Sequence, residues 1–458
     1  MPAVSLDQIA SLAKRRGFIF QSSDIYGGAA ASYDYGPLGV ELKNNIKKTW
    51  WDAMTRGDES IVGLDSSIFM HSKVWEASGH VKSFTDPLVE CLNCHRRFRA
   101  DHLLGEDKYL GIKDDKEKIS SELLQVKCPS CGIKGKFTEQ KQFNMMFKTQ
   151  LGVVEDSGST LYLRPETAQG IYVNAQLIAN AMRLKVPFGI AQIGKAFRNE
   201  VTPGNFTFRT VEFEQMEMQF FVKPDEASNW FENWKKKRME WYESLGFSSE
   251  YLRFYEQKKE ELAHYAKAAF DIHYKMPFGW KEIEGIHNRG DWDLSRHSQY
   301  SGKDLSFLDE STKEKFTPWI IETSAGADRL TLAVLCNAYT EEETEGEKRV
   351  VLKLPLSLVP VQIAIFPLLS NNDQLVDKSR EITKSLRSRF KIQLDESGSI
   401  GRRYRRQDEI GTPFCVTVDH QTLEDNTVTV RKRDEMTQER LSINELENYF
   451  EKVYNCIS

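Results

Sequence analysis

Residues 197–217, FRNEVTPGNFTFRTVEFEQME, carry charged and aromatic side chains at regular positions between apolar, β-rich runs. The turn signal PGN at 203–205 divides these runs, which predicts an antiparallel hairpin. Because side chains alternate along a strand, polar groups and a ring should gather on its faces. We expect one face to hold Arg198 and Glu200, and another to hold Arg209, Phe213 and Glu217. A packed core has no use for this set, whereas a flat ligand that carries phosphates would use all five.

The residue types of this hairpin suit a nucleotide. Arginine recognises phosphate oxygens in planar, bidentate geometry, and each charge-assisted bond contributes about 1.5–3 kcal/mol. Arg198 suits an α-phosphate in its transition state, where stabilisation accelerates the reaction. Phe213 offers a face on which a base can stack, and Glu200 can accept a hydrogen bond from an exocyclic amine. The alternative is a surface hairpin with cross-strand ion pairs.

A second segment with similar chemistry is ETSAGADRL at 322–330. It predicts a strand, a turn and the start of a helix, with Glu322 and Ser324 on one face of the strand. Gly326 allows a close backbone approach. Arg329 lies in the first turn of the helix, whose N-terminus favours phosphate. By itself the segment also fits a buried Gly-Ala turn beside an ordinary helix.

Four of the seven cysteines form two CxxC pairs, CLNC at 91–94 and CPSC at 128–131, with 33 residues between them. Two such pairs can close a tetrahedral zinc site, with Cys91, Cys94, Cys128 and Cys131 as ligands. Free cysteines and redox chemistry are the alternatives. A catalytic zinc is disfavoured because four thiolates leave no open coordination position. With no secretion signal expected, the odd number of cysteines argues against a disulfide framework.

The composition is that of a soluble globular protein, with 458 residues, 40% apolar and 28% charged residues and a net charge of −5. The length suits two or three domains. No apolar run approaches the roughly 20 residues of a membrane helix. The N-terminus lacks the apolar stretch of a signal peptide, so we expect a cytoplasmic protein without a membrane partner. The negative net charge does not indicate a nucleic-acid partner, so an RNA partner would have to bind to local basic patches.

The order of patterns along the chain predicts two structural units. The first would contain an amphipathic helix at 38–54, a charged, mobile stretch at 105–120 and strand signals at 142–217. A helical insertion at 224–268, a strand pattern at 271–286, and a strand, turn and helix at 319–339 would follow. The acidic, polar segment TEEETEGEKRV at 340–350 predicts a linker. The second unit alternates strands, at 361–369, 413–419 and 427–434, with helices at 372–390 and 442–454. This order predicts an α/β module of about 100 residues.

These motifs together resemble a known family. The hairpin fits the pattern F-R-x-E, loop, R-x-x-x-F-x-x-x-E, and ETSAGADRL fits the arginine-bearing third motif of the class II aminoacyl-tRNA synthetases. The homodimeric type of glycyl-tRNA synthetase is similar in RRGFIFQSSDIYGG, YDYGPLGVELKNNIKKTWW, FNMMFKT, YLRPETAQGIYVN and GRRYRRQDEIGTPFCVTVD. The resemblance covers nearly the whole chain. One departure is SIVGLDSSIF, which lacks the proline that usually ends the first class II motif at the dimer axis.

The resemblance implies an α+β catalytic domain over residues 1–345, built on an antiparallel sheet flanked by helices, the class II synthetase fold. Insertions would add a four-cysteine zinc knuckle at about 91–140 and a helical segment at about 224–268. An α/β anticodon-binding domain would follow at 350–458. The implied activity is glycine–tRNA ligation, in which glycine and ATP give glycyl-adenylate and pyrophosphate, and glycine then passes to the 3′ end of tRNA(Gly). The implied assembly is a homodimer.

The resemblance also implies roles in ATP binding. Adenine would lie between Phe213 and Arg329, Arg198 would hold the α-phosphate, and Arg209 would reach the terminal phosphates. These three arginines form the implied catalytic set. Glu282 would bind Mg²⁺ with ATP, because hard cations take carboxylate and phosphate oxygens, and a structural ion pair is the alternative. The full ATP-binding set is Arg198, Asn199, Glu200, Phe208, Arg209, Thr210, Val211, Glu212, Phe213, Glu282, Ile283, Gly326, Ala327, Asp328 and Arg329.

Glycine would bind in a small cavity surrounded by carboxylates that pair with its ammonium group. Clustered carboxylates repel, which favours protonation of one of them. Larger amino acids would be rejected sterically, because adding a methylene to a filled, rigid site causes overpacking. The implied glycine-binding set is Arg99, Glu166, Phe213, Glu214, Gln215, Met216, Glu217, Glu322, Thr323, Ser324, Ala325 and Gly326.

The segment GRRYRRQDE in the second unit places four arginines around a tyrosine. Positive charge beside an aromatic ring suits single-stranded RNA, whose phosphates pair with arginine and whose bases stack. A solvated helix face is the alternative for each arginine. The expected RNA-binding set is Arg402, Arg403, Tyr404, Arg405 and Arg406.

Two other functions fit parts of the pattern. A synthetase-like fold can serve as a non-catalytic subunit that binds RNA or DNA, but such a protein is expected to have lost the phosphate arginines at 198, 209 and 329, which remain here. A zinc-dependent hydrolase is disfavoured by the all-cysteine ligand set. Glycine-dependent ATP–pyrophosphate exchange would separate the three functions.

Overall fold

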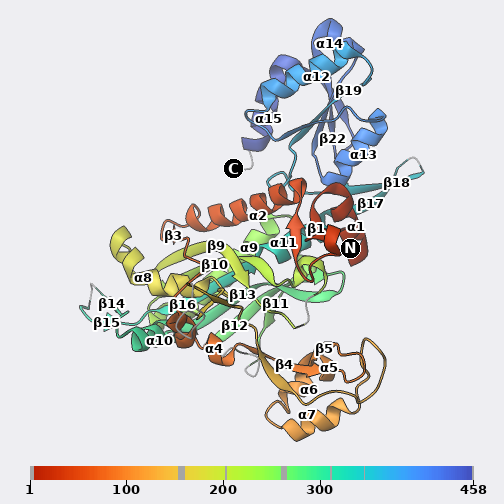
Figure 1. Cartoon of the computed structure of the whole chain (residues 1–458). Coiled ribbons are helices and arrows are strands. Elements are labelled where there is room, and N and C mark those ends of the chain that lie inside the picture. Colours follow the sequence, from red (N-terminus) through yellow and green to blue (C-terminus); the bar gives the residue numbers. More distant parts are fainter. Residues whose placement is uncertain are drawn as a thin grey trace.

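The computed structural model describes residues 5–152, 160–201, 204–258, 262, 266–309, 312–344 and 346–455. Pro203 of the predicted turn, Cys456 and parts of the expected insertion at 224–268 lie outside the described residues. Figure 1 shows a central body with a C-terminal module at one end and a small insertion at the other. No helix within the described ranges is long and apolar enough to cross a membrane.

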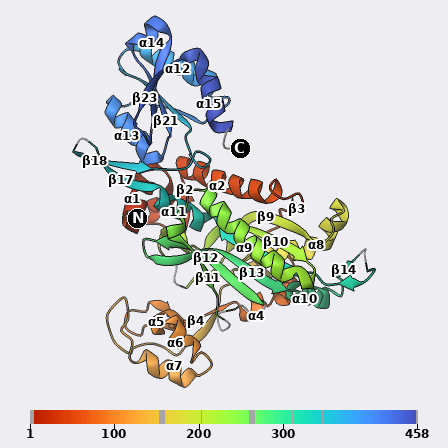
Figure 2. The same cartoon turned by 180° about the vertical axis from the view of Figure 1, so that it is seen from behind.

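The central body is built on a seven-stranded sheet in the order β11-β12-β13-β16-β10-β9-β3 (Figures 1 and 2). Its neighbouring strands are antiparallel, except that β3 runs parallel to β9. This architecture confirms the expected antiparallel sheet. The strands are β3 (Ile61–Gly63), β9 (Phe188–Phe197), β10 (Glu212–Val222), β11 (Leu252–Glu256), β12 (Ala268–Met276), β13 (Gly279–Gly290) and β16 (Trp319–Gly326).

Alternation along β10 separates the two faces of the sheet. Met216, Met218 and Phe220 pack into the main core with α2 (Pro37–Thr55), α9 (Ala227–Ser244) and α11 (Ala327–Ala338). Phe221 faces the other way, into a smaller core formed with α8 (Ala168–Met182) and α10 (Trp292–Ser301). The expected helix at 38–54 corresponds to α2, and the expected strand, turn and helix at 319–339 correspond to β16 and α11.

The hairpin at 197–217 is present, but its connection is longer than predicted. β9 ends at Phe197 and β10 begins at Glu212, with a 3₁₀ turn (η2) at Phe206–Phe208 between them. Arg198, Glu200 and Arg209 therefore lie in the connection, and the prediction that they alternate on strand faces was wrong. The left-handed backbone at Asn205 (φ 56°) helps the connection to fold back, and Asn tolerates that conformation better than most residues.

The insertion forms a small unit of its own, with a three-stranded sheet, three helices and a separate apolar cluster. The prediction of a mobile stretch at 105–120 was wrong in part, because α6 and most of α7 lie within it. The buried side chains of Tyr109 and Ile119 pack these helices against the apolar cluster. The elements are β4 (Thr85–Glu90), β5 (Arg97–Arg99), β6 (Lys141–Asn144), α5 (Ala100–Leu104), α6 (Glu106–Leu110) and α7 (Lys116–Leu123).

The C-terminal module confirms the predicted α/β order. Its sheet runs β20-β19-β21-β22-β23, with β19 parallel to β20 and β21 and the remaining pairs antiparallel. The strands are β19 (Ile363–Pro367), β20 (Ile392–Leu394), β21 (Phe414–Val418), β22 (Thr427–Lys432) and β23 (Gln438–Ser442). The helices are α12 (Asp373–Leu386), α13 (Ile400–Ile410), α14 (His420–Asp425) and α15 (Leu446–Asn455).

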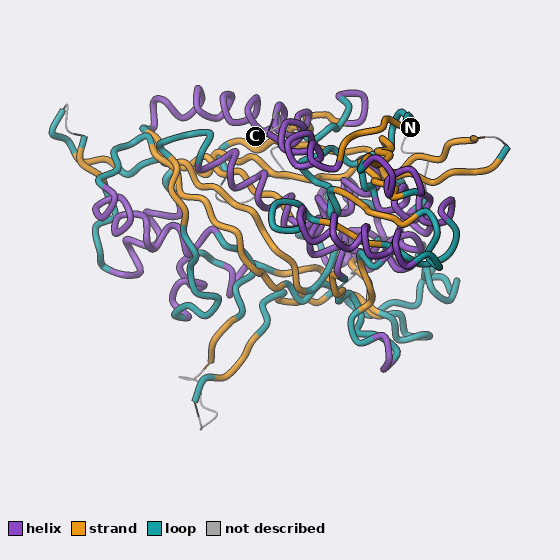
Figure 3. The backbone as a smooth tube through the Cα atoms, turned by 90° about the horizontal axis from the view of Figure 1, so that it is seen from above, coloured by secondary structure: helices purple, strands orange, loops and turns teal. Residues whose placement is uncertain are grey.

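The predicted linker at 340–350 is instead a β-hairpin. β17 (Tyr339–Thr344) and β18 (Glu347–Leu352) pair antiparallel and extend from the body beside the N-terminus (Figure 3). Glu342 lies opposite Arg349 and pairs with it at 2.7 Å, which offsets the acidic charge that suggested a linker. Arg349 also donates to Asp408 of α13 at 2.8 Å, so the hairpin contacts the C-terminal module.

Lys43 of α2 joins three elements of the central body. Its Nζ lies 2.7 Å from Glu214 Oε2 of β10 and 2.7 Å from Asp328 Oδ1 of α11, and its side chain is 6% exposed. Asp328 Oδ2 accepts a further bond from the Glu214 backbone N–H at 2.6 Å. The first turn of α11 is thus fixed to both α2 and β10.

Replacing Lys43 with Met should lower the free energy of unfolding by about 3–5 kcal/mol, because it leaves two carboxylates without their buried cation. Urea unfolding followed by tryptophan fluorescence measures the change. Lys47→Met is the matched control, since Lys47 pairs with Glu214 from a more exposed position and its loss should cost about 1 kcal/mol or less. Equal losses in the two variants would contradict the linking role of Lys43.

Candidate active site

A cavity of about 240 Å³ lies on the polar face of the sheet, bordered by the connection between β9 and β10. Its wall shares Phe208, Arg209, Glu282 and Arg329 with a larger neighbouring cavity of about 940 Å³. The wall residues of the smaller cavity are Glu166, Arg198, Glu200, Thr207, Phe208, Arg209, Thr210, Phe213, Gln215, Glu217, Glu282, Gly285, His287, Glu322, Ser324, Gly326, Asp328 and Arg329.

The three arginines singled out by sequence reach this one cavity from two separate elements. Arg198 Nε donates to the Pro165 carbonyl oxygen at 3.0 Å, which fixes the side chain at the end of β9. Arg209 Nη1 lies 3.9 Å from Glu200 Oε2 within the connection. Arg329, in the first turn of α11, pairs with Glu282 Oε1 at 3.1 Å. Guanidinium groups 131 positions apart in sequence therefore line a common space.

Aromatic rings lie beside two of these guanidinium groups. Arg329 Cζ is 4.5 Å from the centre of the Phe208 ring, and Arg198 Cζ is 5.3 Å from the centre of the Phe213 ring. Both distances fit cation–π contacts. Arg329 thus contacts Phe208, and the expectation that adenine lies between Phe213 and Arg329 stays a prediction. All four side chains belong to the wall of the cavity.

Carboxylates and a hydroxyl gather in the wall formed by β10, β16 and the start of α8. Cross-strand pairing places Glu217 opposite Ser324, and Ser324 Oγ donates to Glu217 Oε1 at 2.8 Å. The Thr167 backbone N–H donates to Glu217 Oε2 at 3.0 Å. Glu322 lies one alternation along β16 and accepts from Arg289 Nη1 at 3.0 Å. The antiparallel register thus brings together residues about 105 positions apart.

The two buried glutamates of this wall have opposite pKa shifts. Burial raises the pKa of Glu217 to about 7, and the nearby charges of Glu322 and Glu166 add to this effect. Burial would also raise the pKa of Glu322, but the charge of Arg289 and the hydrogen bond from His287 lower it to about 2. Glu322 is therefore ionised at neutral pH, while Glu217 titrates there and can gain or lose a proton as a ligand binds.

Several residues expected at the glycine site face the opposite side of the sheet. Glu214 is bound to Lys43 and Lys47 of α2, and Met216 is fully buried in the main core. Thr323 and Ala325 share this orientation on β16, because Met218 pairs with Thr323 and Met216 with Ala325. The Glu214 side chain therefore does not help to build the cavity as expected, since a step of one residue along a strand reverses its face. The expected glycine-binding roles of Met216, Thr323 and Ala325 stay predictions.

Other expected residues lie near the cavity without lining it. Ile283 and Ala327 are fully buried in the main core, and Glu212 is exposed, with Lys195 as its partner. Backbone N–H groups of Asn199 and Val211 donate to Met145 and Ala31. Arg99 lines only the larger cavity, where it pairs with Asp86 at 3.0 Å. The side chains of Asn199, Val211, Glu212, Ile283 and Ala327 thus do not line the smaller cavity, and neither does Arg99. Their expected roles toward ATP and the amino-acid substrate stay predictions.

Sequence analysis missed some residues of the wall. Gly285 and His287 occupy alternate positions of β13 and face Ser324 and Glu322 across the strand pair. His287 Nδ1 lies 2.7 Å from Glu322 Oε1. The strand was predicted, and its alternation would have indicated these residues if the pairing of β13 with β16 had been known. Thr207 is also in the wall and carried no recognisable signal.

The four cysteines of the CxxC pairs come together in the insertion. Their sulfur atoms all lie within 4.8 Å of one another, with 3.7 Å between Cys91 and Cys131 and 3.7 Å between Cys94 and Cys128. A tetrahedral zinc with Zn–S bonds of about 2.3 Å separates its sulfurs by about 3.8 Å. The cluster therefore has the size and the ligand chemistry of a structural zinc site.

The expected RNA-binding residues lie on α13 but differ in exposure. Arg402 and Arg405 are exposed. Arg403 is 1% exposed and donates to the Gly398 and Pro367 carbonyl oxygens, so including it in an RNA surface was wrong. The Tyr404 ring packs against Phe366 with its centroid 5.4 Å away, and Arg406 pairs with Asp395 at 2.7 Å.

Comparison with known proteins identifies the family. A model described as "tRNA synthetase class II core domain (G, H, P, S and T)" matches residues 147–338, and a model described as "Anticodon binding domain" matches residues 362–453. The glycine–tRNA ligase of Streptomyces coelicolor is 53% identical over 459 residues, covering 98% of each chain. Those of Thermobifida fusca and Treponema denticola are each 52% identical, covering 99% of both chains in the first comparison, and 97% of this chain and 96% of the relative in the second. The chain therefore belongs to the glycine–tRNA ligase family of the class II aminoacyl-tRNA synthetases.

Proposed function

We propose that the cavity beside the β9–β10 connection is where this ligase activates glycine. The observation that carries the proposal is the convergence of Arg198, Arg209 and Arg329 on a cavity whose other wall holds Glu217 and Glu322. Guanidinium groups suit the phosphates of ATP, and carboxylates suit the ammonium group of glycine. The two halves of the cavity thus match the two reactants.

As a glycine–tRNA ligase, the chain catalyses two steps. The carboxylate of glycine attacks the α-phosphorus of ATP, an oxygen–phosphorus bond forms, and pyrophosphate leaves with the electrons of the broken bond. The glycyl-adenylate then transfers glycine to a ribose hydroxyl at the 3′ end of tRNA(Gly), and AMP leaves. No side chain need form a covalent intermediate, so orientation and neutralisation of phosphate charge account for the rate.

Each nucleotide contact has a candidate residue. Arg198 suits the α-phosphate, and Arg209 suits the terminal phosphates. Within the described part of the chain, the buried Glu200 Oε2 has no hydrogen-bond partner, and an exocyclic amine of the base would supply one. The Phe213 and Phe208 rings can stack with adenine. Glu282 could bind Mg²⁺ together with ATP, in exchange for its ion pair with Arg329.

Glycine recognition is assigned to the carboxylate wall. Glu166, Glu217 and Glu322 would surround the ammonium group, and Ser324 fixes the orientation of Glu217 through its hydroxyl group. These three carboxylates are almost fully buried, so a substrate side chain larger than that of glycine would meet packed atoms. Steric exclusion of larger amino acids follows from this arrangement without an editing site.

Contact with tRNA involves the C-terminal module in this proposal. Its match to an anticodon-binding model and the exposed arginines Arg402 and Arg405 support the assignment. We divide the chain into a catalytic domain at 1–345 and an anticodon-binding domain at 350–458, joined through the β17–β18 hairpin. Since charging of tRNA supplies translation, the cytoplasm is the compartment in which we place this activity.

A second copy of the chain is the proposed partner in assembly. Val173 and Leu177, four residues apart on α8, are 38% and 68% exposed. Large apolar side chains on one exposed helix face are typical of interaction surfaces. A homodimer that covers this face is consistent with the sequence resemblance.

Zinc is the metal proposed for the cysteine cluster. The four thiolates would complete its coordination, so the ion would stabilise the insertion and take no part in catalysis. The insertion has only a small apolar cluster, and a metal site would add to its stability.

Replacing Arg198 with Ala should reduce glycine-dependent ATP–pyrophosphate exchange by about 10²–10³-fold, because the variant loses one donor to the transition state. Circular dichroism should show that the fold is retained. Arg402→Ala is the matched control, which should keep the exchange rate and raise the KM for tRNA in aminoacylation. Unchanged exchange in Arg198→Ala would refute the assigned role.

The KM for glycine should fall as the pH rises toward 7 and level off above it. Glu217 has a pKa raised to about 7 and is neutral below that pH, so the cavity then lacks one negative charge to pair with the ammonium group. The decrease in KM should approach about tenfold per pH unit below the pKa. Exchange assays at saturating ATP between about pH 5.5 and 8.5 measure it, and Glu217→Gln should flatten the profile. A KM that rises with pH would contradict the assignment.

Purified protein should contain about one zinc per chain by elemental analysis. Cys131→Ser should lose the metal and lower the melting temperature, because the site would lose one of its four ligands. Cys336→Ser changes a buried cysteine of α11 outside the cluster and should retain the metal. Absence of zinc from folded, active protein would end this assignment.

A further inference from the structure

We propose that His80 is a positioning residue for glycine recognition, which orients the Glu166 carboxylate toward the amino-acid end of the cavity. His80 is not among the residues of the cavity wall, whereas Glu166 is. Any effect of His80 on the substrate must therefore pass through Glu166. The inference rests on the proposed role of Glu166 in binding the ammonium group.

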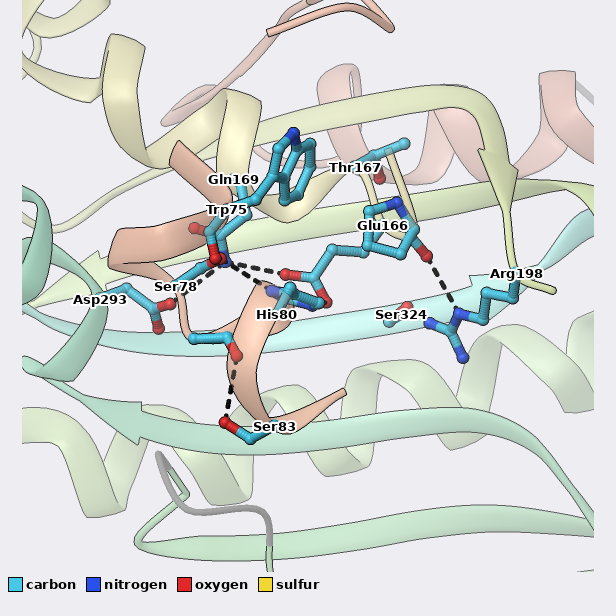
Figure 4. Close-up of polar contacts among 12 residues, drawn as sticks. Trp75, Ser78, His80, Ser83, Glu166, Thr167, Gln169, Arg198, Asp293 and Ser324 are labelled. Carbon is cyan, nitrogen blue, oxygen red and sulfur yellow. Dashed lines mark hydrogen bonds and ion pairs between the residues drawn. The ribbon is translucent and has the colours of Figure 1, made fainter. Parts of the chain in front are cut away.

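His80 contacts Glu166 with one ring nitrogen and is anchored by the other. Nε2 lies 3.4 Å from Glu166 Oε2, and Nδ1 lies 2.8 Å from Ser78 Oγ. Ser78 Oγ is also 3.3 Å from the Trp75 carbonyl oxygen. Because an ionised carboxylate can only accept a hydrogen bond, the ring nitrogen that faces it carries the proton. Figure 4 shows this arrangement, with Glu166 beside His80.

The segment before β4 holds the His80 ring in place. α3 (Ser72–Ala77) and α4 (His80–Ser83) are separated by Ser78 and Gly79, and the φ of 80° at Gly79 lets the chain turn sharply between them. The imidazole packs edge-on against Trp75, with centroids 5.7 Å apart, and lies 5.2 Å from the Phe84 ring. His80 is 8% exposed, so this packing leaves the ring little freedom to rotate.

Glu166 is held from a second direction by Gln169. Gln169 Nε2 donates to Glu166 Oε1 at 2.8 Å, and Gln169 Oε1 lies 2.8 Å from His297 Nε2. Each carboxylate oxygen therefore has its own polar partner. Contacts to both oxygens fix the plane of the carboxylate, whereas a single contact would leave it free to turn. His80 thus supplies one of two restraints on a wall residue of the cavity (Figure 4).

The contact also sets the charge of Glu166. Burial alone would raise the pKa of this carboxyl, but the charge of His80, together with that of Arg289, holds the pKa well below its usual range. Glu166 therefore remains ionised when Glu217 takes up a proton. An ammonium ligand pairs best with a carboxylate that stays ionised. The orientation of the Glu166 carboxylate then decides how far the bound glycine lies from the α-phosphate.

A different reading is that His80 only fills space in the core. Two near-isosteric substitutions separate the possibilities, because Gln places its amide nitrogen near the position of Nε2, whereas Asn places it near Nδ1. His80→Gln keeps a donor toward Glu166, and His80→Asn removes it. Asn is also one methylene smaller than Gln, so an unchanged KM for ATP in His80→Asn is needed to exclude an effect of the lost volume.

We expect His80→Asn to raise the KM for glycine about 10–100-fold in ATP–pyrophosphate exchange, with the KM for ATP unchanged within about twofold. His80→Gln should stay within about threefold of the parent enzyme for both substrates. If both variants raise the two KM values together, or if Asn and Gln behave alike, the positioning role is refuted. If His80→Asn does not fold, Ser78→Ala, which removes the anchor of the ring, replaces it. Ser78→Ala should raise the KM for glycine about threefold and leave the KM for ATP unchanged. An unchanged KM for glycine in this variant would also refute the positioning role.

Glu166→Gln distinguishes failure of this inference from failure of the site assignment. It should raise the KM for glycine at least as much as His80→Asn, and the double variant should be no worse than Glu166→Gln alone, because His80 acts through that carboxylate. If Glu166→Gln leaves the KM for glycine unchanged, the proposed role of Glu166 falls and this inference falls with it. If Glu166→Gln raises it and His80→Asn does not, the inference alone is wrong.

Discussion

Charge compensation inside a buried cavity is the constraint on which the rest of this structure depends. Glu166, Glu217 and Glu322 line one wall and repel one another, and an isolated ionised group in such a place would cost several kcal/mol. Arg289 and His287 offset Glu322. Among the residues that the structure describes, the two Glu217 oxygens are bound by uncharged donors, including Thr167 and Ser324. The pKa of Glu217 is raised because burial and the nearby carboxylates disfavour its negative charge. In the role proposed for this wall, the ammonium group of glycine would supply the missing positive charge, so the repulsion among the carboxylates would contribute to recognition.

The alternation of the central strands makes this wall possible and was the most informative feature of the sequence. On β10, apolar residues at alternate positions pack against α2, α9 and α11, and the positions between them point to the other face of the sheet. Phe213 and Glu217 share that face on β10, as Glu322 and Ser324 do on β16. Their meeting depends on β10 pairing with β16, which local patterns could not reveal. The family resemblance implied only that these residues share one pocket. The motif arginines stood out by residue type and spacing, and the resemblance then supplied their expected roles.

The errors of sequence analysis have physical causes in particular places. Glu214 was grouped with its neighbours in a motif, although one step along a strand turns a side chain to the opposite face. The acidic run at 340–350 suggested a linker because its partner, Arg349, lies across a hairpin that composition does not show. Arg403 looked like an RNA ligand, but carbonyl oxygens of its own module satisfy its guanidinium group. His80 was overlooked because its significance lies in a contact with a residue 86 positions away.

The β17–β18 hairpin has a mechanical consequence. α11, which carries Arg329, continues directly into β17, and β18 is fastened to α13 through Arg349 and Asp408. Asp408 also accepts from Arg431 of β22 at 3.0 Å, so the attachment reaches the sheet of the C-terminal module. The central body and the C-terminal module are therefore connected by paired strands and ion pairs, and not by a flexible linker. Because this frame keeps the distance between Arg329 and α13 constant, a tRNA that contacted both places, as proposed, would have to span that fixed distance.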